Sequence, residues 1–340
     1  MNLLVTGAAG FIGSHFVRLV LEDRPEVLVV VVDALTYSGN RSTMADFADR
    51  VTFHQARIQD AAAMNRIVES EGVTHIVNFA AESHNDRSME CAAEFLDTNV
   101  GGTYTLLEAT RKFELAKMVH VSTDEVYGSI ATGEFTESSP LEPNTLYSAS
   151  KAGGDLQCRA HHRAYGTPVS ITRGGNTYGP FQYPEKLIPF FVTRLIDGKK
   201  VPVYGDGSQV REWIYVRDHC AGILKVLDAG LPGEAYNVGD TNERRNMDIV
   251  RILLEETGQQ DSLVKHIPDP RQGAHDARYS MRCDKLNALG WKPEHPFDET
   301  LRMTVRWYRE HQPWWREVTS KPEQVEFVRR YYGPGLGEDL

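Results

Sequence analysis

The chain has 340 residues, of which 41% are hydrophobic and 25% are charged, with a formal net charge of −10 at pH 7. This composition is typical of a soluble globular protein of one or two domains. The longest apolar run has only the length of a buried strand, which excludes a membrane-spanning helix of roughly 18 residues. The negative charge argues against a nucleic-acid groove, since phosphate binding requires a basic excess. Met1 leads directly into an apolar strand without a signal-peptide pattern, so we expect a cytoplasmic protein.

Strand-like and helical patterns alternate through the first half of the chain. Such alternation predicts an α/β fold with a Rossmann-type, doubly wound parallel sheet. The strand patterns lie at residues 2–6, 27–32, 51–54, 74–79, 117–122 and 168–172, and the helix patterns at 12–22, 61–71, 98–113 and 148–165. After Arg173 this rhythm ends, and the chain becomes richer in proline and aromatic residues. We therefore expect a dinucleotide-binding domain at 1–173 plus about 212–240, and a smaller substrate-binding lobe at about 174–211 plus 241–340.

A glycine-rich turn follows the first predicted strand. It contains Gly7, Gly10 and Gly13 and leads into a helix pattern. Glycines there allow a tight turn and close approach of the backbone to a pyrophosphate, while the helix N-terminus offers free N–H groups to the anion. The second predicted strand ends in Asp33, about twenty residues later, where an acid accepts hydrogen bonds from ribose hydroxyls and repels a 2′-phosphate. The pattern therefore favours NAD over NADP.

An acid pair follows the predicted strand at 117–122. The carboxyl ends of parallel strands are where open α/β sheets bind ligands, so Thr123, Asp124 and Glu125 are candidate catalytic residues. The other interpretation of this segment is a helix start, with Thr123 as the cap and two acids in the first turn.

Tyr147 and Lys151 are four residues apart in a helix pattern, so their side chains lie on one helical face. A phenol with a reference pKa of about 10 needs a neighbouring cation to act as a base near neutrality, and Lys151 can supply it. Alone, the spacing is also met by chance in surface helices; together with the glycine turn and the acid pair it indicates a redox site.

The four cysteines are Cys91, Cys158, Cys220 and Cys283. They are scattered, with no CxxC and no His/Cys pairing at metal-ligand spacing. We expect reduced thiols and no metal site.

Several segments together resemble the dTDP-glucose 4,6-dehydratases of the extended short-chain dehydrogenase/reductase superfamily. They occur in the expected order, at residues 5–15, 33–40, 79–84, 122–128, 147–152, 184–189 and 204–207. The resemblance implies a hexose-nucleotide substrate, a bound NAD and a homodimer paired through the helices at 98–113 and 148–165. The pair Asp124-Glu125 is the feature that selects this branch, since related epimerases have neither acid.

The resemblance also implies a reaction cycle. Tyr147 takes the C4 hydroxyl proton as hydride passes to NAD⁺, and Thr123 hydrogen-bonds the same oxygen. Glu125 then removes the C5 proton, Asp124 protonates the departing C6 oxygen, and the hydride returns to C6. Since NAD⁺ is regenerated in each turnover, we expect it to stay bound.

The remaining site residues are carried over from the family by position. The expected cofactor-binding residues are Gly7, Gly10, Phe11, Ile12, Gly13, Asp33, Ala34, Leu35, Thr36, Ile58, Phe79, Ala80, Ala81, Asn99, Ser122, Tyr147 and Lys151. The expected substrate-binding residues are Ser83, Thr123, Asn176, Lys186, Leu187, Pro202, Val203, Tyr204, Arg211, Asn246, Arg271 and His275. Arg211 suits a diphosphate because of its forked donors; the other interpretation is a surface ion pair with Glu212.

Three positions depart from the family pattern. Arg57 stands where an acid usually accepts from the adenine amino group, so adenine recognition must use the Ile58 backbone or Gln59. Asn85 replaces a usual valine, and Thr177 replaces a usual asparagine. The stretch at 269–275 also differs from the family pattern, so the nucleotide base stays open, with dTDP-glucose as the first choice and UDP-glucose as the alternative. The functions of other classes are a C4 epimerase and a non-catalytic NAD-binding sensor.

Overall fold

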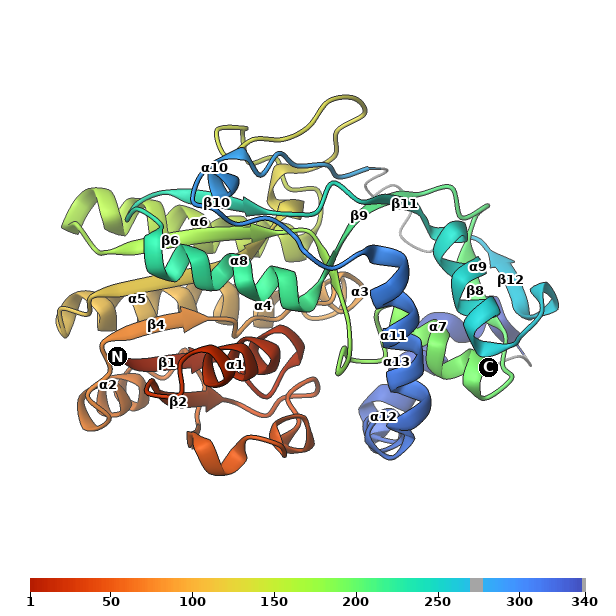
Figure 1. Cartoon of the computed structure of the whole chain (residues 1–340), viewed down its shortest axis with the longest axis horizontal. Helices are drawn as coiled ribbons and strands as arrows, with labels where there is room; N and C mark the ends of the chain where they lie inside the picture. The colour runs from red at the N-terminus through yellow and green to blue at the C-terminus, as the bar shows by residue number, and fades with distance from the viewer. Residues whose placement is uncertain (270–277, 338–340) are drawn as a thin grey trace.

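Within residues 1–269 and 278–337, which the computed structural model describes, seven parallel strands form the largest sheet (Figure 1). Its order is β10-β6-β5-β4-β1-β2-β3. The strands are β1 (Asn2–Thr6), β2 (Leu28–Asp33), β3 (Thr52–Gln55), β4 (His75–Asn78), β5 (Lys117–Thr123), β6 (Val169–Gly174) and β10 (Ala235–Val238). The strand order reverses between β1 and β4, and the carboxyl ends of such neighbours border a ligand-binding crevice. The Rossmann-type fold predicted from the sequence is confirmed.

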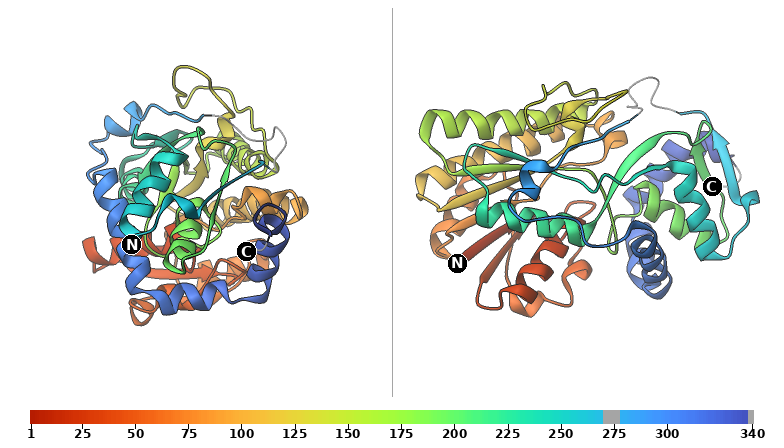
Figure 2. Two further views of the ribbon diagram at one scale, coloured as in Figure 1. Left: turned by 90° about the vertical axis from the view of Figure 1, so that its right-hand side faces the viewer. Right: turned by 45° about the horizontal axis from the view of Figure 1, so that its top comes forward.

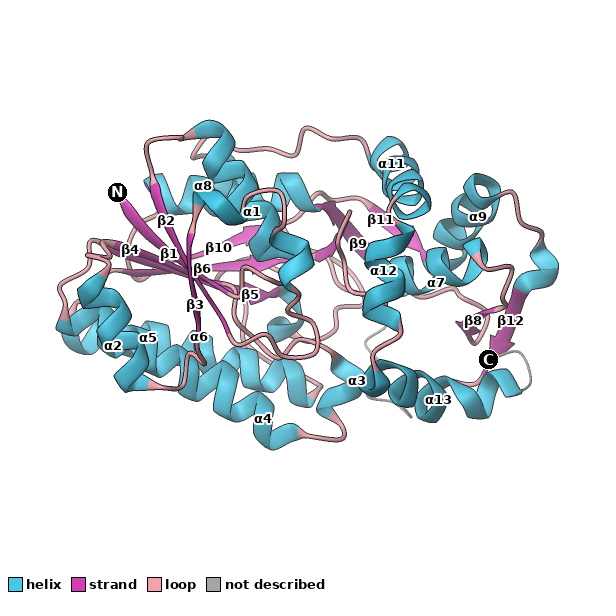
Figure 3. Ribbon diagram, turned by 90° about the horizontal axis from the view of Figure 1, so that it is seen from below, coloured by secondary structure: helices cyan, strands magenta, loops and turns pink. Residues whose placement is uncertain are grey.

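Helices cover both faces of this sheet, as the view in Figure 3 shows. On one face lie α1 (Phe11–Asp23), α8 (Val216–Ala229) and α10 (Asp284–Asn287); on the other lie α2 (Ala61–Ser70), α5 (Thr103–Lys112) and α6 (Leu146–Tyr165). Every residue of β5 is buried, because the strand is central and covered on both sides. Even Lys117 is accommodated there, since its Nζ donates to the carbonyl oxygens of Val226 and Gly230 at 2.6 and 2.5 Å.

Short helical segments connect the larger elements. The helix expected at 98–113 is instead a π-helical turn, η3 (Asp97–Gly102), followed by α5. Gly102 packs against Ile58 with no room for a Cβ atom, which is one reason for the irregular turn. The other short segments are η1 (Arg41–Met44), η2 (Ala48–Arg50), α3 (Asn85–Ser88), α4 (Ala92–Leu96), η4 (Asp124–Tyr127) and η5 (Asp261–Leu263).

The smaller lobe lies beyond the carboxyl ends of the sheet, on the right in Figure 1 and in the right-hand view of Figure 2. It has a three-stranded sheet, a two-stranded sheet and a separate aromatic-rich core. Its strands are β7 (Asn176–Tyr178), β8 (Val201–Tyr204), β9 (Val210–Tyr215), β11 (Glu243–Arg245) and β12 (Val264–Ile267). Its helices are α7 (Leu187–Ile196), α9 (Asn246–Thr257), α11 (Phe297–Glu310), α12 (Gln312–Thr319) and α13 (Pro322–Leu336).

Two segments connect the two halves. Strand β9 pairs with β7 and β11, while its Ile214 packs in the same core cluster as α8. Residues 283–291, assigned to the lobe from the sequence, instead pack in the core of the large domain. The reason is that Leu286 and Trp291 fill the space above Gly222 of α8, and Trp291 Nε1 donates to the carbonyl oxygen of Asp218 at 3.2 Å.

None of the helices within the described ranges combines the length and the apolar character that a membrane crossing requires.

Candidate functional site

A cavity of about 470 Å³ lies between the carboxyl edge of the large sheet and the lobe, and both halves line it. It brings together most of the residues predicted from the sequence: Gly7, Gly10, Phe11, Ile12, Gly13, Asp33, Ala34, Thr36, Ile58, Phe79, Ala80, Ala81, Ser83, Ser122, Thr123, Glu125, Tyr147, Lys151, Asn176, Lys186, Leu187, Pro202, Val203, Tyr204, Arg211 and Asn246. Leu35, Asn99 and Asp124 do not line it. Arg271 and His275 lie outside the described residues.

The glycine turn has the shape that a pyrophosphate needs. Gly7 has a φ of +70°, and a Cβ atom on it would lie 2.6 Å from the backbone nitrogen of Ala80. No side chain caps the first turn of α1 at Gly10, so the N–H groups there are available to an anion. Ser122, buried at the end of β5 in the cavity wall, has a hydroxyl with no hydrogen-bond partner among the described residues. These features fit a bound dinucleotide.

Asp33 lines the cavity at the end of β2 and also shapes the loops around it. Its Oδ2 accepts from the Ala9 N–H at 2.9 Å, and its Oδ1 accepts from the Leu35 N–H at 2.8 Å. Burial raises the pKa of Asp33, while these two N–H donors oppose the rise. Leu35, with a φ of 52°, thus contributes through its backbone, which explains why its side chain does not line the cavity.

Asn99 lies behind the cavity wall and braces the loop after β4. Its Nδ2 donates to the Glu82 carbonyl oxygen and the Ser150 hydroxyl at 2.9 and 2.8 Å, and its Oδ1 accepts from the Glu82 N–H. Because its amide is fully used in this way, Asn99 supports the site without reaching into it.

Arg57, Ile58 and Gln59 lie in the cavity wall where adenine recognition was expected. The Gln59 amide nitrogen already donates to Asp97 Oδ2 at 3.1 Å and to Thr98 Oγ1 at 2.8 Å. Because the Gln59 amide nitrogen already makes these two hydrogen bonds, the Ile58 backbone is the more available of the two expected groups for recognition of adenine.

The acid pair lies in η4, directly after β5. Thr123 caps this turn, accepting from the Glu125 N–H at 3.3 Å, and its hydroxyl donates to Asp124 Oδ1 at 3.1 Å. Glu125 lines the cavity, and Asp124 lies directly beside it, with Oδ2 near Gly175 of the cavity wall. Asp124 Oδ2 has no hydrogen-bond partner within the described residues. Burial, assisted by the carboxylates of Glu125 and Glu212, raises the pKa of Asp124 well above its usual range.

Helix α6 positions the tyrosine and the lysine. Thr145 and Ser148 form a capping box at its N-terminus, so the first turn is well defined. Tyr147 hydrogen-bonds the Thr123 side chain, and burial together with Glu125 raises the pKa of its phenol. Lys151 Nζ donates to the Val121 carbonyl oxygen at 2.7 Å, and burial lowers its pKa to about 8.

The lobe supplies the opposite wall. Lys186, at the start of α7, donates from Nζ to the Ser83 carbonyl oxygen at 2.8 Å and so connects two expected substrate positions across the crevice. Arg211 and Glu212 point to opposite sides of β9. Glu212 is buried and accepts from the N–H groups of Asp240, Thr241 and Met281, whereas the Arg211 guanidinium lies in the cavity wall, 4.8 Å from the centre of the Tyr279 ring.

Two residues of the site were not predicted as site residues from the sequence. Asn85 lines the cavity and donates from Nδ2 to Glu125 Oε2 at 2.8 Å. His219 is buried in the wall, with Nδ1 2.7 Å from Thr177 Oγ1 and Nε2 without a partner among the described residues. The substitutions at 85 and 177 were the only signals in the sequence, and neither indicated these contacts.

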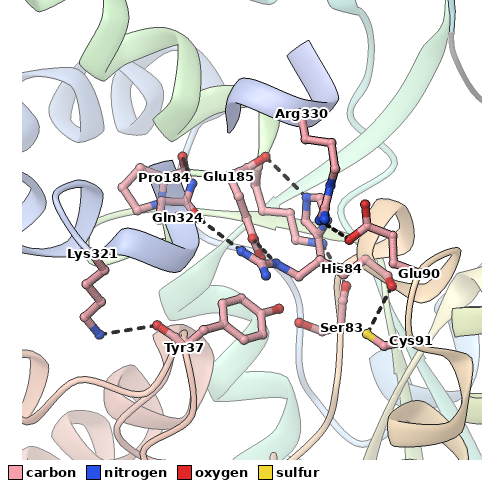
Figure 4. Close-up of polar contacts among 12 residues, drawn as sticks. Tyr37, Ser83, His84, Glu90, Cys91, Pro184, Glu185, Lys321, Gln324 and Arg330 are labelled. Carbon is pink, nitrogen blue, oxygen red and sulfur yellow. Dashed lines mark hydrogen bonds and ion pairs between the residues drawn. The ribbon is translucent and has the colours of Figure 1, made fainter. Parts of the chain in front are cut away.

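A cluster of buried and half-buried side chains around Arg87 and Glu185 joins the lobe to the large domain, and Figure 4 labels Tyr37, Glu185 and Gln324 of it. Arg87 Nε donates to Glu185 Oε2 at 2.9 Å, and its Nη2 donates to Gln324 Oε1 of α13 at 3.1 Å. The Arg87 guanidinium also lies 4.0 and 4.4 Å from the ring centres of Tyr37 and Phe327. The cluster therefore connects the loop after Asp33, the loop after β4 and the C-terminal helix.

Known proteins share both the sequence and this architecture. The pattern of the GDP-mannose 4,6 dehydratase family matches residues 4–304. A dTDP-glucose 4,6-dehydratase of Streptomyces antibioticus is 44% identical, over 98% of this chain and 100% of that protein. The crystal structure of DesIV, a dTDP-glucose 4,6-dehydratase of Streptomyces venezuelae solved with NAD bound, is 51% identical with a TM-score of 0.90, covering 94% of this chain and 100% of that one.

A UDP-glucose 4-epimerase of Thermotoga maritima has nearly the same shape, with a TM-score of 0.85, but only 30% identity over 92% of this chain and 100% of that one. Shape alone therefore does not separate dehydratase from epimerase, whereas sequence identity, 51% to the dehydratase and 30% to the epimerase, does. The chain belongs to the GDP-mannose 4,6 dehydratase family and, within it, to the dTDP-glucose 4,6-dehydratases of the extended short-chain dehydrogenase/reductases.

Proposed function

We propose that the protein is an NAD-dependent hydro-lyase that converts dTDP-glucose into the 4-keto-6-deoxy sugar nucleotide. One observation carries this proposal: Glu125 and Tyr147 line the same cavity, and Thr123 joins them through hydrogen bonds to both the acid pair and the phenol. An oxidation-only site needs the tyrosine and the lysine; an elimination needs the acids as well.

The residues that would hold NAD are those of the glycine turn, Asp33, and the cavity wall around Ile58, Ala80 and Ser122. When bound, NAD⁺ accepts the hydride from C4 of the sugar and later returns it to C6. Asp33 would accept from the ribose hydroxyls, and its negative charge disfavours a 2′-phosphate.

In the first step the C4 hydroxyl loses its proton while a hydride leaves carbon C4. Tyr147 would receive that proton, and Thr123 would hold the C4 oxygen. The raised pKa of the phenol means that it needs a cation near it to act as a base. Lys151, one helical turn later on the same face, would supply the charge.

The second step removes water across C5 and C6. The C4 ketone acidifies the C5 proton, which Glu125 would take as the general base. Asp124 would protonate the C6 hydroxyl, so that the C6–O bond breaks and water leaves with a C5–C6 double bond formed. Burial, assisted by the carboxylates of Glu125 and Glu212, raises the pKa of Asp124, which favours the protonated form that a general acid requires. Hydride addition at C6 and proton return to C5 from Glu125 would give the product, and transfer to Asp124 of the proton gained by Tyr147 would restore the enzyme.

The substrate diphosphate would bind Arg211, a residue whose forked guanidinium suits phosphate oxygens. Asn176, Lys186 and Asn246 would contact the sugar and phosphates, and the β8 segment Pro202–Tyr204 would line the base pocket; all of them border the cavity. Arg271 and His275 remain predictions from the family pattern.

A homodimer is part of the proposal. Five large apolar side chains on α5, α6 and the residue before η3 are each at least 45% exposed: Leu96, Tyr104, Leu146, Leu156 and Tyr165. Helices with such faces pair readily with a second copy, which would bury these side chains. A cytoplasmic location stays a prediction from the sequence.

The test is incubation of the purified protein, without added NAD, with dTDP-glucose and with UDP-glucose separately. We expect dTDP-glucose to give a product lighter by one water, with the alkali-induced absorbance of a 4-keto-6-deoxy sugar. Product from UDP-glucose alone would reassign the base; conversion to the C4 epimer without mass change would identify an epimerase. Bound NAD with no turnover of either sugar would support the sensor.

A further inference from the structure

Asn85 joins the two parts of the site that the proposed reaction uses. From its place after β4, its Nδ2 donates to Glu125 Oε2 at 2.8 Å, and its Oδ1 accepts from Thr145 Oγ1 at 2.9 Å. Thr145 is the N-cap of α6, the helix that carries Tyr147 and Lys151. A single amide therefore bridges the acid-bearing turn after β5 and the start of the catalytic helix.

The hydrogen-bond network determines which way this amide faces. Thr145 Oγ1 accepts from the Ser148 N–H at 3.0 Å and lies 2.8 Å from Ser148 Oγ, which has the Thr145 carbonyl oxygen as an acceptor at 3.2 Å. The Thr145 hydroxyl hydrogen is donated to the oxygen of Asn85. With its oxygen engaged there, Asn85 must present its NH₂ group to Glu125. Asn85 also begins the short helix α3, where Ser88 Oγ donates to its backbone carbonyl oxygen at 2.6 Å and leaves its side-chain amide free of that contact.

We infer that Asn85 is a positioning residue that orients Glu125 toward the cavity and keeps its carboxylate ionised. Donation from a neutral amide favours the charged form of a carboxylate over the protonated form. The bridge to Thr145 keeps Glu125 at a constant separation from Tyr147, so that the base and the redox tyrosine face one substrate. This role rests on the proposed function for its catalytic meaning, but the ionisation of Glu125 is measurable without turnover.

The test compares wild type with Asn85→Leu, which keeps the approximate size and removes both hydrogen bonds. The NAD-loaded proteins are labelled with [δ-¹³C]glutamate, and the Glu125 signal is assigned by its absence in Glu125→Gln. We expect the titration midpoint of Glu125 to rise by about one pH unit in Asn85→Leu, which is about a tenfold change in its ionisation constant. The acidic limb of kcat/KM for dTDP-glucose should move by the same amount, with a smaller change in rate on the alkaline side.

Asn85→Asp is the second variant, because it has nearly the same shape and folds even if leucine is not tolerated. It places a second carboxylate beside Glu125, so the midpoint should rise at least as far. Ser88→Ala is the matched control: it removes a hydrogen bond from the same turn without touching Glu125 and should leave the midpoint and the pH profile unchanged.

An unmoved Glu125 midpoint in both Asn85 variants, or a uniform loss of rate without a change in the pH profile, would overturn the inference and leave Asn85 a packing residue. A moved midpoint in a protein whose wild type makes no product from dTDP-glucose would instead refute the proposed function and retain the contact. The carbon spectrum thus tests the role of Asn85, and the product assay separately tests the proposed function.

Discussion

Lys151 donates a 2.7 Å hydrogen bond from Nζ to the carbonyl oxygen of Val121, which anchors helix α6 to strand β5. Because Tyr147 lies one turn earlier on the same face, this anchor also sets the phenol beside Thr123 at the strand end. The ammonium group is buried, and its desolvation is what lowers the pKa of Lys151 to about 8.

The pH dependence of the reaction should therefore have an alkaline limb near pH 8. The cation that favours the phenolate is present below this pKa and is lost as the pH rises through it. We expect kcat/KM to fall above about pH 8, measured with dTDP-glucose. In Lys151→Met the limb should be absent and the rate lower by roughly 10²-fold at pH 7. Lys292→Met, at an exposed position, serves as the control; a limb that persists in Lys151→Met would assign it to another group.

Glu125→Gln should separate oxidation from elimination. The amide cannot take the C5 proton, so we expect turnover to fall by about 10²- to 10⁴-fold while NAD stays bound. Since C4 oxidation precedes this step, absorbance of reduced cofactor at about 340 nm should accumulate on mixing with dTDP-glucose. The same change at exposed Glu134 is the control. Undiminished dehydration by Glu125→Gln would show that another base acts at C5.

The Arg87–Glu185 pair should matter for stability as a unit. Glu185 is 3% exposed, so removal of its cation in Arg87→Met leaves an unpaired buried carboxylate at a cost of about 3 kcal/mol. Burial already raises the pKa of Glu185, and Arg87 opposes that rise. The double variant Arg87→Met/Glu185→Gln should lose less than the sum of the single changes, measured by urea denaturation of the NAD-loaded protein. Strict additivity would mean that the two side chains do not interact energetically.

The helical face at α5 and α6 should hold the dimer together. Leu156 is 52% exposed, and Leu156→Asp would place a charge in the interface. We expect light scattering to give a dimer mass for wild type and a monomer mass for the variant. Leu231, 63% exposed beyond α8, provides the matched control as Leu231→Asp, which should stay dimeric. A monomeric wild type would refute the proposed assembly.

The sequence by itself determined the Rossmann-type sheet, the dinucleotide turn and the Tyr147–Lys151 pair. Each of these depends on residues close together in the chain: apolar periodicity, the three glycines before α1, and a four-residue helical spacing. Strand ends then converge at one edge because the strands are parallel, and Asp33 and Glu125 line the same cavity as the glycine turn.

Only the tertiary structure decided which residues support that site. Asn85 reaches Glu125 across 40 positions of sequence, and Arg87 reaches Gln324 across 237, contacts that no local pattern specifies. The position of Asp124 also depends on packing between elements. The 3₁₀ turn η4 places its Oδ2 near Gly175 of the cavity wall. Local periodicity specifies an element and its faces, but the pairing of polar side chains between elements depends on how those faces pack.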